Sequence, residues 1–361
     1  MIPIRKKDCV GCGAKANVHK ASETIVVKVS NSSAPTEDPF LQEVKFYKRL
    51  FEEKDRCLDI VDCFIALPNY IFLSYCCNDN LARRFFKYQE REIRPNGRPG
   101  KLLGIKNIRT LRLFLNGYNN SPQPFLGIKV YEDPTLIARW IQQLSSALAF
   151  MEKLGYTHND LHPRNCLLDE NLNLKLSDFD QTTTIGQFLE SLMEPWAIKL
   201  SSGPLSNTYG LTSARTEQFA VGTFLYTMVY GHEPYEDIHL EEDPIELRRR
   251  FRALEFPELN RHDVFDNLIS ACWYNVYPTM ALVAYDFKRK TKDIASSSDY
   301  KIVDYVKEKN TCIALLQGGL LGPEWALSYQ PTWRRYLHAI VGNFLFIWKR
   351  SVNFLGSLFR R

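Results

Sequence analysis

The spacing of apolar residues over the first part of the chain has two periods. Apolar runs at 25–29, 57–67 and 69–77 are rich in β-branched and aromatic residues, which is typical of strands. From 38 to 54 the apolar residues instead recur three or four positions apart, as on one face of a helix. Turn-forming residues at 78–80 end the last apolar run. With two shorter strands before residue 25, the pattern predicts an antiparallel sheet of about five strands with one helix.

The next regular pattern is a long helix. Apolar residues recur at helical spacing over 134–154, Asp133 and Pro134 are suited to begin the helix, and Gly155 is suited to end it. Residues 166–179 then predict two short strands joined by a turn. We therefore expect a second, mainly helical unit after the sheet.

The C-terminal tail has an amphipathic pattern. From Trp333 onward, apolar residues recur every three or four positions among several Arg and Lys residues, which predicts an amphipathic helix. Three uses stay open for it: packing on the rest of the chain, lying on a membrane surface, or binding a partner helix.

Composition and charge narrow the class of protein. The chain has 361 residues, 45% of them hydrophobic, enough for two compact lobes. Its nine cysteines and the absence of an apolar signal-peptide core predict reduced thiols and a cytoplasmic protein, with the nucleus or peripheral membrane association left open. The net charge of +5 is mild, so we predict no nucleic-acid partner. No apolar run is long enough to predict a membrane span.

One segment departs from this average. Between residues 83 and 112 there are ten Lys or Arg and two Glu. This predicts a basic, turn-rich surface insertion at about 83–132, with binding of an acidic partner or an anionic surface as the alternative.

The residues with the clearest chemistry lie between 158 and 180. Asp160, Asn165 and Asp178 bring two carboxylates and an amide close together if the two short strands pair. Phosphoryl transfer needs a carboxylate to orient the accepting hydroxyl and oxygen ligands for magnesium, which neutralises charge on the transferring phosphate. Asp160 suits the first role, and the other two suit the second.

The predicted sheet adds basic and small residues that fit the same chemistry. Val10 to Val18 reads VGCGAKANV, a glycine-rich loop that would let backbone N–H groups approach phosphates, although Ala16 stands where a third glycine is usual. Lys28 lies in an apolar strand, where it is either a phosphate ligand or a charge at the strand edge. Glu43, on the predicted helix, could pair with it.

Together these residues resemble the protein-kinase superfamily. Residues 158–165, HNDLHPRN, are similar to the HRDLxxxxN loop of these enzymes, and 178–180, DFD, are similar to DFG. Glu217 stands where an Asp usually anchors the catalytic loop, and 272–280 resembles the late CW…PTM motif. The segment around Glu217 is most similar to kinase-domain proteins of filamentous fungi.

The resemblance implies an α+β, bilobal fold and a set of site residues. It implies an N-lobe at 1–80, a C-lobe at 81–290 that includes the basic insertion, and a C-terminal extension at 291–361. It implies ATP and Mg²⁺ as cofactors, with Asp160 as catalytic base and magnesium held by Asn165 and Asp178. The further residues implied are Lys28, Glu43 and Arg164 in catalysis, Val10, Gly11, Gly13, Val18 and Lys28 around the phosphates, and Ser74 and Cys76 at the adenine.

Several positions depart from the family pattern. Asn159 replaces an Arg that often receives a phosphorylated activation-segment residue, so that form of switching is not expected. His162 replaces the Lys of serine/threonine kinases, while Arg164 stands where tyrosine kinases carry an Arg. Asp180 replaces the DFG glycine, and we expect it to face solvent, with a further metal contact as the alternative.

The function predicted is ATP-dependent transfer of phosphate to a Ser or Thr hydroxyl of a protein substrate by a monomeric kinase. The alternatives are a pseudokinase scaffold that binds nucleotide without turnover, motivated by Ala16, Asn159 and Asp180, and a small-molecule phosphotransferase.

Overall fold

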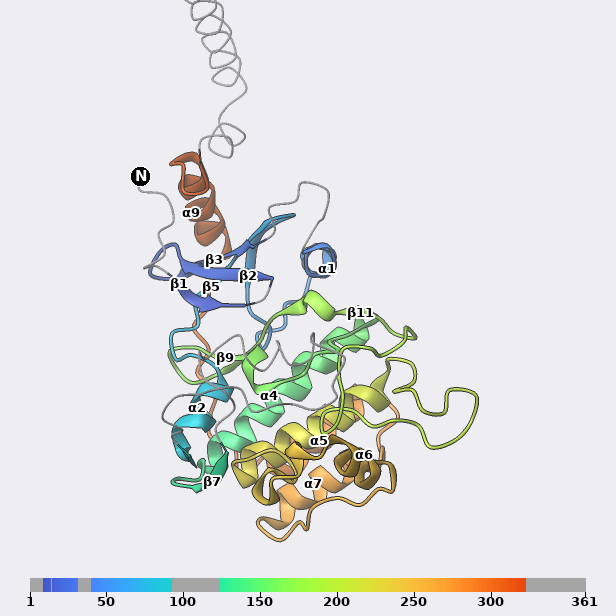
Figure 1. The fold of residues 1–361 in the computed structure, drawn as a ribbon. Helices are drawn as coiled ribbons and strands as arrows, with labels where there is room; N and C mark the ends of the chain where they lie inside the picture. Colours follow the sequence, from blue (N-terminus) through green and yellow to red (C-terminus); the bar gives the residue numbers. More distant parts are fainter. Residues whose placement is uncertain (1–8, 14, 32–39, 93–123, 323–361) are drawn as a thin grey trace, which may run out of the picture.

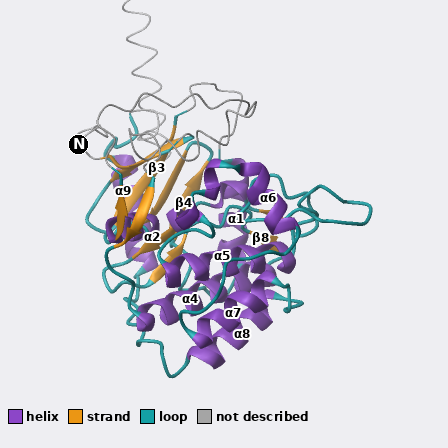
Figure 2. Ribbon diagram, turned by 60° about the horizontal axis from the view of Figure 1, so that its bottom comes forward, coloured by secondary structure: helices purple, strands orange, loops and turns teal. Residues whose placement is uncertain are grey.

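The computed structural model describes residues 9–13, 15–31, 40–92 and 124–322. A small lobe built on a five-stranded sheet lies against a larger, mainly helical lobe (Figure 1). Figure 2 shows the larger sheet in the first lobe and most helices in the second. The predicted α+β, bilobal fold is therefore confirmed.

The sheet of the small lobe is antiparallel, with strand order β1-β2-β3-β5-β4. Its strands are β1 Cys9–Cys12, β2 Ala16–Lys20, β3 Ile25–Ser30, β4 Cys63–Leu67 and β5 Tyr70–Ser74. The predicted five strands are all present. The strand predicted over 57–67 starts only at Cys63, because Ile60 instead forms a parallel bridge with Leu176 of the large lobe.

The two faces of this sheet are covered by different parts of the chain. Side chains alternate between faces along a strand, so Val26 and Lys28 point to one side while Ile25 and Val27 point to the other. Helix α1, Leu41–Glu52, lies toward the first side and buries Glu43, Val44, Phe46 and Tyr47. Helix α9, Tyr305–Gln317, covers the second side (Figure 1).

The core of the large lobe is built from four long helices. The predicted helix after Asp133 is α4, whose first turn is capped by the Asp133 carboxylate accepting from Thr135 N at 2.8 Å. Helix α5 is buried over almost its whole length because α4, α7 and α8 pack around it. The α-helices of this lobe within the described residues are α2 Leu81–Tyr88, α4 Pro134–Lys153, α5 Ala214–Tyr230, α6 Pro244–Arg252, α7 Asp263–Trp273 and α8 Met280–Thr291.

Short two-stranded sheets complete the large lobe. The predicted pair after the catalytic loop is present as β9 with β10. The remaining strands pair as β8 with β11 and β6 with β7. Their bounds are β6 Gln89–Arg91, β7 Phe125–Ile128, β8 Tyr156–Thr157, β9 Cys166–Leu168, β10 Leu174–Leu176 and β11 Thr183–Thr184.

The basic insertion differs from its prediction at both ends. Residues expected to be a turn-rich loop form α2, β6 and β7. Asn80 caps α2 by accepting from Arg83 N at 3.0 Å, and the buried Leu81 and Phe85 anchor the helix beneath its basic residues. The expectation of a loop overlooked this apolar stripe. Residues 93–123, the middle of the insertion, lie outside the described residues.

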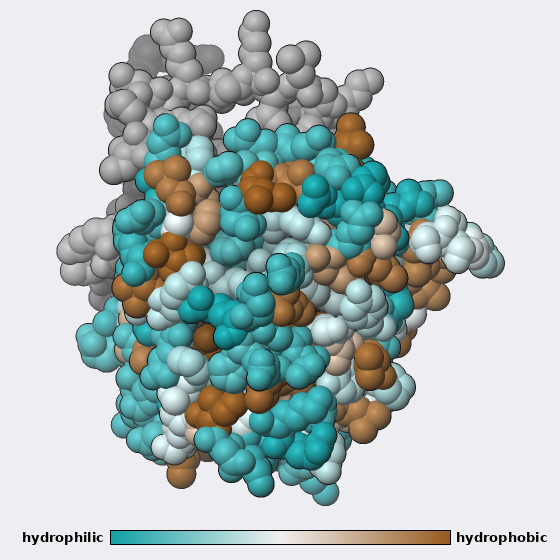
Figure 3. All heavy atoms as spheres, turned by 90° about the horizontal axis from the view of Figure 1, so that it is seen from below, coloured by the Kyte–Doolittle hydropathy of each residue, from teal (hydrophilic) through white to brown (hydrophobic). Residues whose placement is uncertain are grey.

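The surface of the described residues is mostly polar. The face seen from below in Figure 3 is mainly hydrophilic, with separate apolar patches. Among the residues that the structure describes, no helix is long and apolar enough to cross a membrane. The predicted amphipathic helix after Trp333 lies outside the described residues.

Candidate active site

The loop that carries Asp160 is fixed from below by a buried glutamate. Glu217 lies on α5, is 3% exposed, and accepts from the backbone N–H groups of His158 at 3.0 Å and Asn159 at 3.3 Å. A carboxylate that accepts two backbone N–H groups holds the loop in one conformation. Glu217 therefore makes the anchoring contacts expected for the residue at this position.

Asn165 orients the carboxylate of Asp160. It ends the short 3₁₀ helix η2, Pro163–Asn165, and its side-chain Nδ2 donates to Asp160 O at 2.7 Å and to Asp160 Oδ2 at 3.0 Å. Asn165 is 7% exposed, and its backbone carbonyl accepts from Ser177 N at 2.8 Å. The strand pair thus brings 158–165 and the segment around Asp178 together, as predicted.

Asp178 is held in an unusual backbone conformation by its neighbour. Its φ of 65° lies in the left-handed region, which costs free energy for a residue with a side chain. The next residue, Phe179, is fully buried, with its ring 4.5 Å from Phe46, 5.5 Å from Tyr47 and 5.4 Å from His158. The packing of Phe179 under α1 therefore fixes the position of the Asp178 carboxylate.

Lys28 joins the two lobes through ion pairs. Its Nζ lies 2.6 Å from Glu43 Oε2 and 2.7 Å from Asp178 Oδ1. Burial of Lys28 disfavours its charged form, yet Asp178 and Glu43 together raise the pKa of the ammonium well above its usual range. Lys28 is therefore a fixed positive charge, and the expected pair with Glu43 is present.

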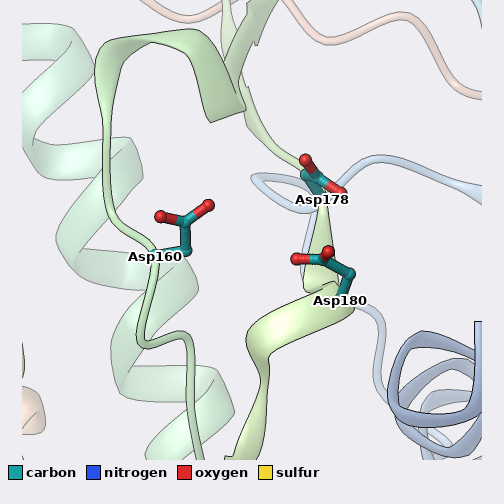
Figure 4. Close-up of side chains that lie close together, drawn as sticks. All are labelled: Asp160, Asp178 and Asp180. Atoms are coloured by element: carbon teal, nitrogen blue, oxygen red, sulfur yellow. The ribbon is translucent and has the colours of Figure 1, made fainter. Parts of the chain in front are cut away.

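Three carboxylates face a common space beside this ion pair (Figure 4). Oxygen atoms of Asp160, Asp178 and Asp180 all lie within 4.8 Å of one another. Burial, followed by the charges of Asp178 and Asp180, raises the pKa of Asp160 to about 7. Burial alone would also raise the pKa of Asp178, but Lys28 reverses the direction and lowers it. The pKa values of Asp160 and Asp178 thus shift in opposite directions within one site, as expected for two carboxylates with different roles.

The expectation that Asp180 faces solvent is wrong. Its side chain is 16% exposed, and its Oδ2 lies 2.7 Å from the Nζ of Lys15. Asp180 belongs to the short 3₁₀ helix η3, Phe179–Gln181, which turns its carboxylate toward Asp160 and Asp178. The partner is a lysine 165 residues away, so no local pattern in the sequence could have revealed it.

The glycine-rich loop is a β1–β2 hairpin. Gly11 pairs with Val18 across it, Gly13 N donates to Ala16 O at 2.8 Å, and Val10 is 38% exposed. A side chain at Gly13 would lie 3.2 Å from Ala16 O, so a small residue suits the close approach of the two strands. The sequence identified this loop but gave Lys15 no role, because a lysine in a surface hairpin carries no spacing signal.

The residues predicted to contact adenine, and Arg164, lie as follows. Ser74 ends β5, and its N–H donates to Asp62 O at 2.9 Å, so an adenine contact there would use its carbonyl. Cys76 is buried just beyond it. Arg164 is exposed, and its positive charge acts to lower the pKa of Asp160 against the larger effect of burial.

The donor set fits a hard divalent cation. A carboxylate at Asp178 and an amide oxygen at Asn165 are oxygen ligands of the kind that Mg²⁺ takes together with phosphate oxygens. Cysteine and histidine, which favour zinc, do not belong to the carboxylate cluster. These residues could hold magnesium beside a nucleotide.

A five-stranded sheet over a helical lobe, with a Lys–Glu–Asp bridge between them and an Asp–Asn catalytic loop, defines the protein-kinase fold. The family model described as protein tyrosine and serine/threonine kinase matches residues 4–278. The chain therefore belongs to the protein kinase family, which confirms the predicted superfamily.

Curated relatives include kinases of both acceptor types. The chain is 33% identical over 134 residues, 36% of its length, to the tyrosine-protein kinase transforming protein Abl of Abelson murine leukemia virus and to the tyrosine-protein kinase ABL2 of Homo sapiens. It is 34% identical over 133 residues, also 36% of its length, to the CBL-interacting serine/threonine-protein kinase 5 of Arabidopsis thaliana. The matched segments make up 18%, 11% and 29% of these three relatives, so the likeness covers only part of each.

Proposed function

We propose that this protein is an ATP- and Mg²⁺-dependent protein kinase that transfers the γ-phosphate to a Ser or Thr hydroxyl of a protein substrate. The observation that carries the proposal is the position of Lys28, which bridges Glu43 and Asp178, with the Asp160 carboxylate within 4.8 Å of the Asp178 carboxylate. A fixed cation, a proposed cation ligand and a candidate base around one space are the groups that phosphoryl transfer needs, which supports the proposal.

The residues would divide the reaction between them. Lys28, with its charge fixed by Glu43, would hold the phosphates of ATP. Asp160, held by Asn165, would orient the acceptor hydroxyl and take its proton. Asp178 and Asn165 would hold Mg²⁺, which neutralises negative charge on the phosphates when bound. Val10, Gly11, Gly13 and Val18 would cover the phosphates, and Ser74 and Cys76 would contact the adenine.

The pKa of Asp160 supports a base role. A carboxylic acid with an ordinary pKa is a weak base at neutral pH, whereas burial and neighbouring charges raise the pKa of Asp160 to about 7. General bases work best when their pKa lies near the operating pH. The large-lobe anchor, Glu217, keeps this residue on a rigid loop.

The wider assignment follows the same proposal. The small lobe would comprise residues 1–80, the large lobe 81–290 and the C-terminal extension 291–361. We propose a monomer. The Ser/Thr acceptor is supported by likeness to CBL-interacting serine/threonine-protein kinases, and the likeness to Abl makes Tyr the alternative outcome of the test. Arg164, beside Asp160, is the residue that we expect to influence this choice.

The test is phosphate transfer from ATP with Mg²⁺ by the purified full chain, using itself and generic Ser, Thr and Tyr peptides as acceptors. Asp160→Asn is expected to slow transfer about 10²–10⁴-fold while ATP affinity stays within a few fold of the wild type. Asp55→Asn, whose side chain is 85% exposed, is the matched control and is expected to leave transfer unchanged. Equal activity of Asp160→Asn and the wild type would contradict the assigned base.

A second outcome separates the alternatives. Wild-type protein that binds ATP but transfers no phosphate to any acceptor would favour a nucleotide-binding scaffold. Transfer to a small-molecule alcohol and to no peptide would favour a small-molecule phosphotransferase.

A further inference from the structure

The small lobe reaches the carboxylate cluster through two lysines. Lys28 Nζ lies 2.7 Å from Asp178 Oδ1, and Lys15 Nζ lies 2.7 Å from Asp180 Oδ2. Lys28 comes from the central strand β3 and is 12% exposed, whereas Lys15 comes from the tip of the β1–β2 hairpin and is 52% exposed. The kinase family pattern requires neither the lysine nor the aspartate of the Lys15–Asp180 ion pair at these positions.

Asp180 poses an electrostatic problem for a site that binds ATP. Its carboxylate lies within 4.8 Å of those of Asp160 and Asp178, where it adds a negative charge beside the expected position of the phosphates. Two like charges a few ångströms apart in a partly dehydrated site repel each other by more than they would in bulk water. An uncompensated carboxylate here would weaken the binding of an anionic nucleotide.

Lys15 supplies the missing compensation. Its ammonium is in direct contact with Asp180. Burial raises the pKa of Asp178, and the positive charge of Lys15 acts against this effect, as Lys28 and His158 do more strongly. An ammonium has three N–H donors, so the contact with one carboxylate leaves donors for phosphate oxygens. Because Lys15 lies at the tip of the glycine-rich loop, this places a cation between the loop and the carboxylate cluster.

We propose that Lys15 and Asp180 form a compensating pair in which Asp180 holds the Lys15 ammonium over the site and Lys15 contacts the terminal phosphates of bound ATP. The inference rests on the proposed function, and it adds a phosphate-contacting side chain from the glycine-rich loop. Asp180 acts through Lys15 and is therefore a positioning residue. The pair differs from the Lys28 pair because it is exposed at one end and can rearrange when ligand enters.

The test measures binding of ATP, ADP and AMP to the full chain by calorimetry in the presence of Mg²⁺. Lys15→Ala is expected to weaken ATP binding about tenfold, with a smaller effect on ADP and none on AMP, because only the terminal phosphates lose a contact and face an uncompensated Asp180. The double variant Lys15→Ala with Asp180→Gly is expected to bind ATP more tightly than Lys15→Ala alone. Lys15→Arg, which keeps the charge, is expected to restore most of the affinity.

A control variant and three contrary outcomes complete this test. The control is Lys20→Ala, which removes a cation from the same hairpin. Lys20 Nζ lies 3.1 Å from Glu23 Oε2, and its loss is expected to leave the affinities for ATP, ADP and AMP unchanged. Equal loss of ATP and AMP affinity in Lys15→Ala would overturn the inference. So would a double variant that binds ATP no better than Lys15→Ala, a result that would assign Asp180 to the metal instead. Wild-type protein that binds neither ATP nor ADP would refute the proposed function itself, and this inference with it.

Discussion

The two lobes are connected on two sides, which we call the front, where the carboxylate cluster lies, and the back, where α9 covers the sheet. Charged side chains make the contacts at the front, and apolar packing and a tyrosine make those at the back. At the front, Lys28 and Lys15 reach Asp178 and Asp180 across the site. At the back, the segment after α8 runs from the large lobe to the small lobe and ends in α9. Its Tyr300 accepts from Gln143 Nε2 of α4 at 2.9 Å and donates to Asp59, which precedes β4.

The back of the sheet has a small core of its own. Cys312, Leu316 and Leu320 pack on Ile25, Val27, Phe64 and Phe72, while Tyr305 OH donates to Cys63 O at 2.6 Å. The guanidinium of Arg56 also lies 3.8 Å from the centre of the Tyr305 ring. These contacts bury apolar surface, whose stabilising effect does not depend on a ligand.

The difference indicates that the front contacts serve ligand binding and the back contacts serve stability. An ion pair with one exposed partner, such as Lys15 with Asp180, exchanges partners at little net cost, so this contact can be remade around a nucleotide. Buried apolar contacts cannot be exchanged in this way, so the back fixes the sheet while the front changes. Substitutions at the front should therefore alter transfer, with a loss of stability as well where they leave a buried charge unpaired, and substitutions at the back should alter stability alone.

The largest effect is expected from Lys28→Met at the front. Loss of the fixed cation should slow phosphate transfer about 10²–10³-fold, the usual cost of removing one oriented charge from such a site. It also leaves Glu43, which is fully buried, without its ion-pair partner, so thermal stability should fall too.

Adding Glu43→Gln should separate these two effects. The double variant should regain thermal stability without regaining transfer. Transfer at the wild-type rate in Lys28→Met would refute the role of the front link.

At the back, Leu316→Ala should act on stability instead. Leu316 is fully buried against the outer face of the sheet, and removal of such a side chain costs about 2–5 kcal/mol of unfolding free energy. Transfer measured well below the unfolding midpoint should change little. Val306→Ala on the same helix, where the side chain is 69% exposed, is the control and should leave the midpoint of urea unfolding unchanged. Equal effects of the two variants would mean that α9 does not cover the sheet in solution.

Tyr300→Phe should have a smaller effect on stability. It removes a donor from Asp59, which is 7% exposed, whereas Gln143 Nε2 keeps Asn173 Oδ1 and Ser298 Oγ as acceptors. Loss of the bond to Asp59 costs about 1–3 kcal/mol because this carboxylate stays buried. Urea unfolding at neutral pH measures this cost.

The cost of Tyr300→Phe should also depend on pH. Burial raises the pKa of Asp59, while the hydrogen bond from Tyr300 acts to lower it. Without Tyr300 the pKa of folded Asp59 rises further, so Asp59 takes up its proton at a higher pH in the variant than in the wild type. Because this proton binds more tightly in the folded than in the unfolded state, the free energy of unfolding of the variant begins to increase at a higher pH as the pH is lowered. The difference between the two proteins should shrink as the pH falls through the folded pKa of Asp59, and a constant difference would refute this account.

Much of the fold could be predicted from the sequence because it depends on local patterns. The helix α4 with Asp133 and Gly155 at its ends, the pairing of β9 with β10 and the five-stranded sheet all follow from spacing and turn residues. The basic insertion was predicted less well, because its charge concealed the two apolar residues that anchor α2.

Within the site, the sequence by itself indicated that Asp160, Asn165 and Asp178 lie close together and that Glu43 could pair with Lys28. Fixed offsets along the chain carry that information. Only the tertiary structure decided where Asp180 points and that Lys15 meets it, because the two residues are 165 positions apart and their contact depends on how the hairpin lies over the large lobe. It also decided that α9 covers the back of the sheet, since an apolar helix face does not specify which surface it will bury.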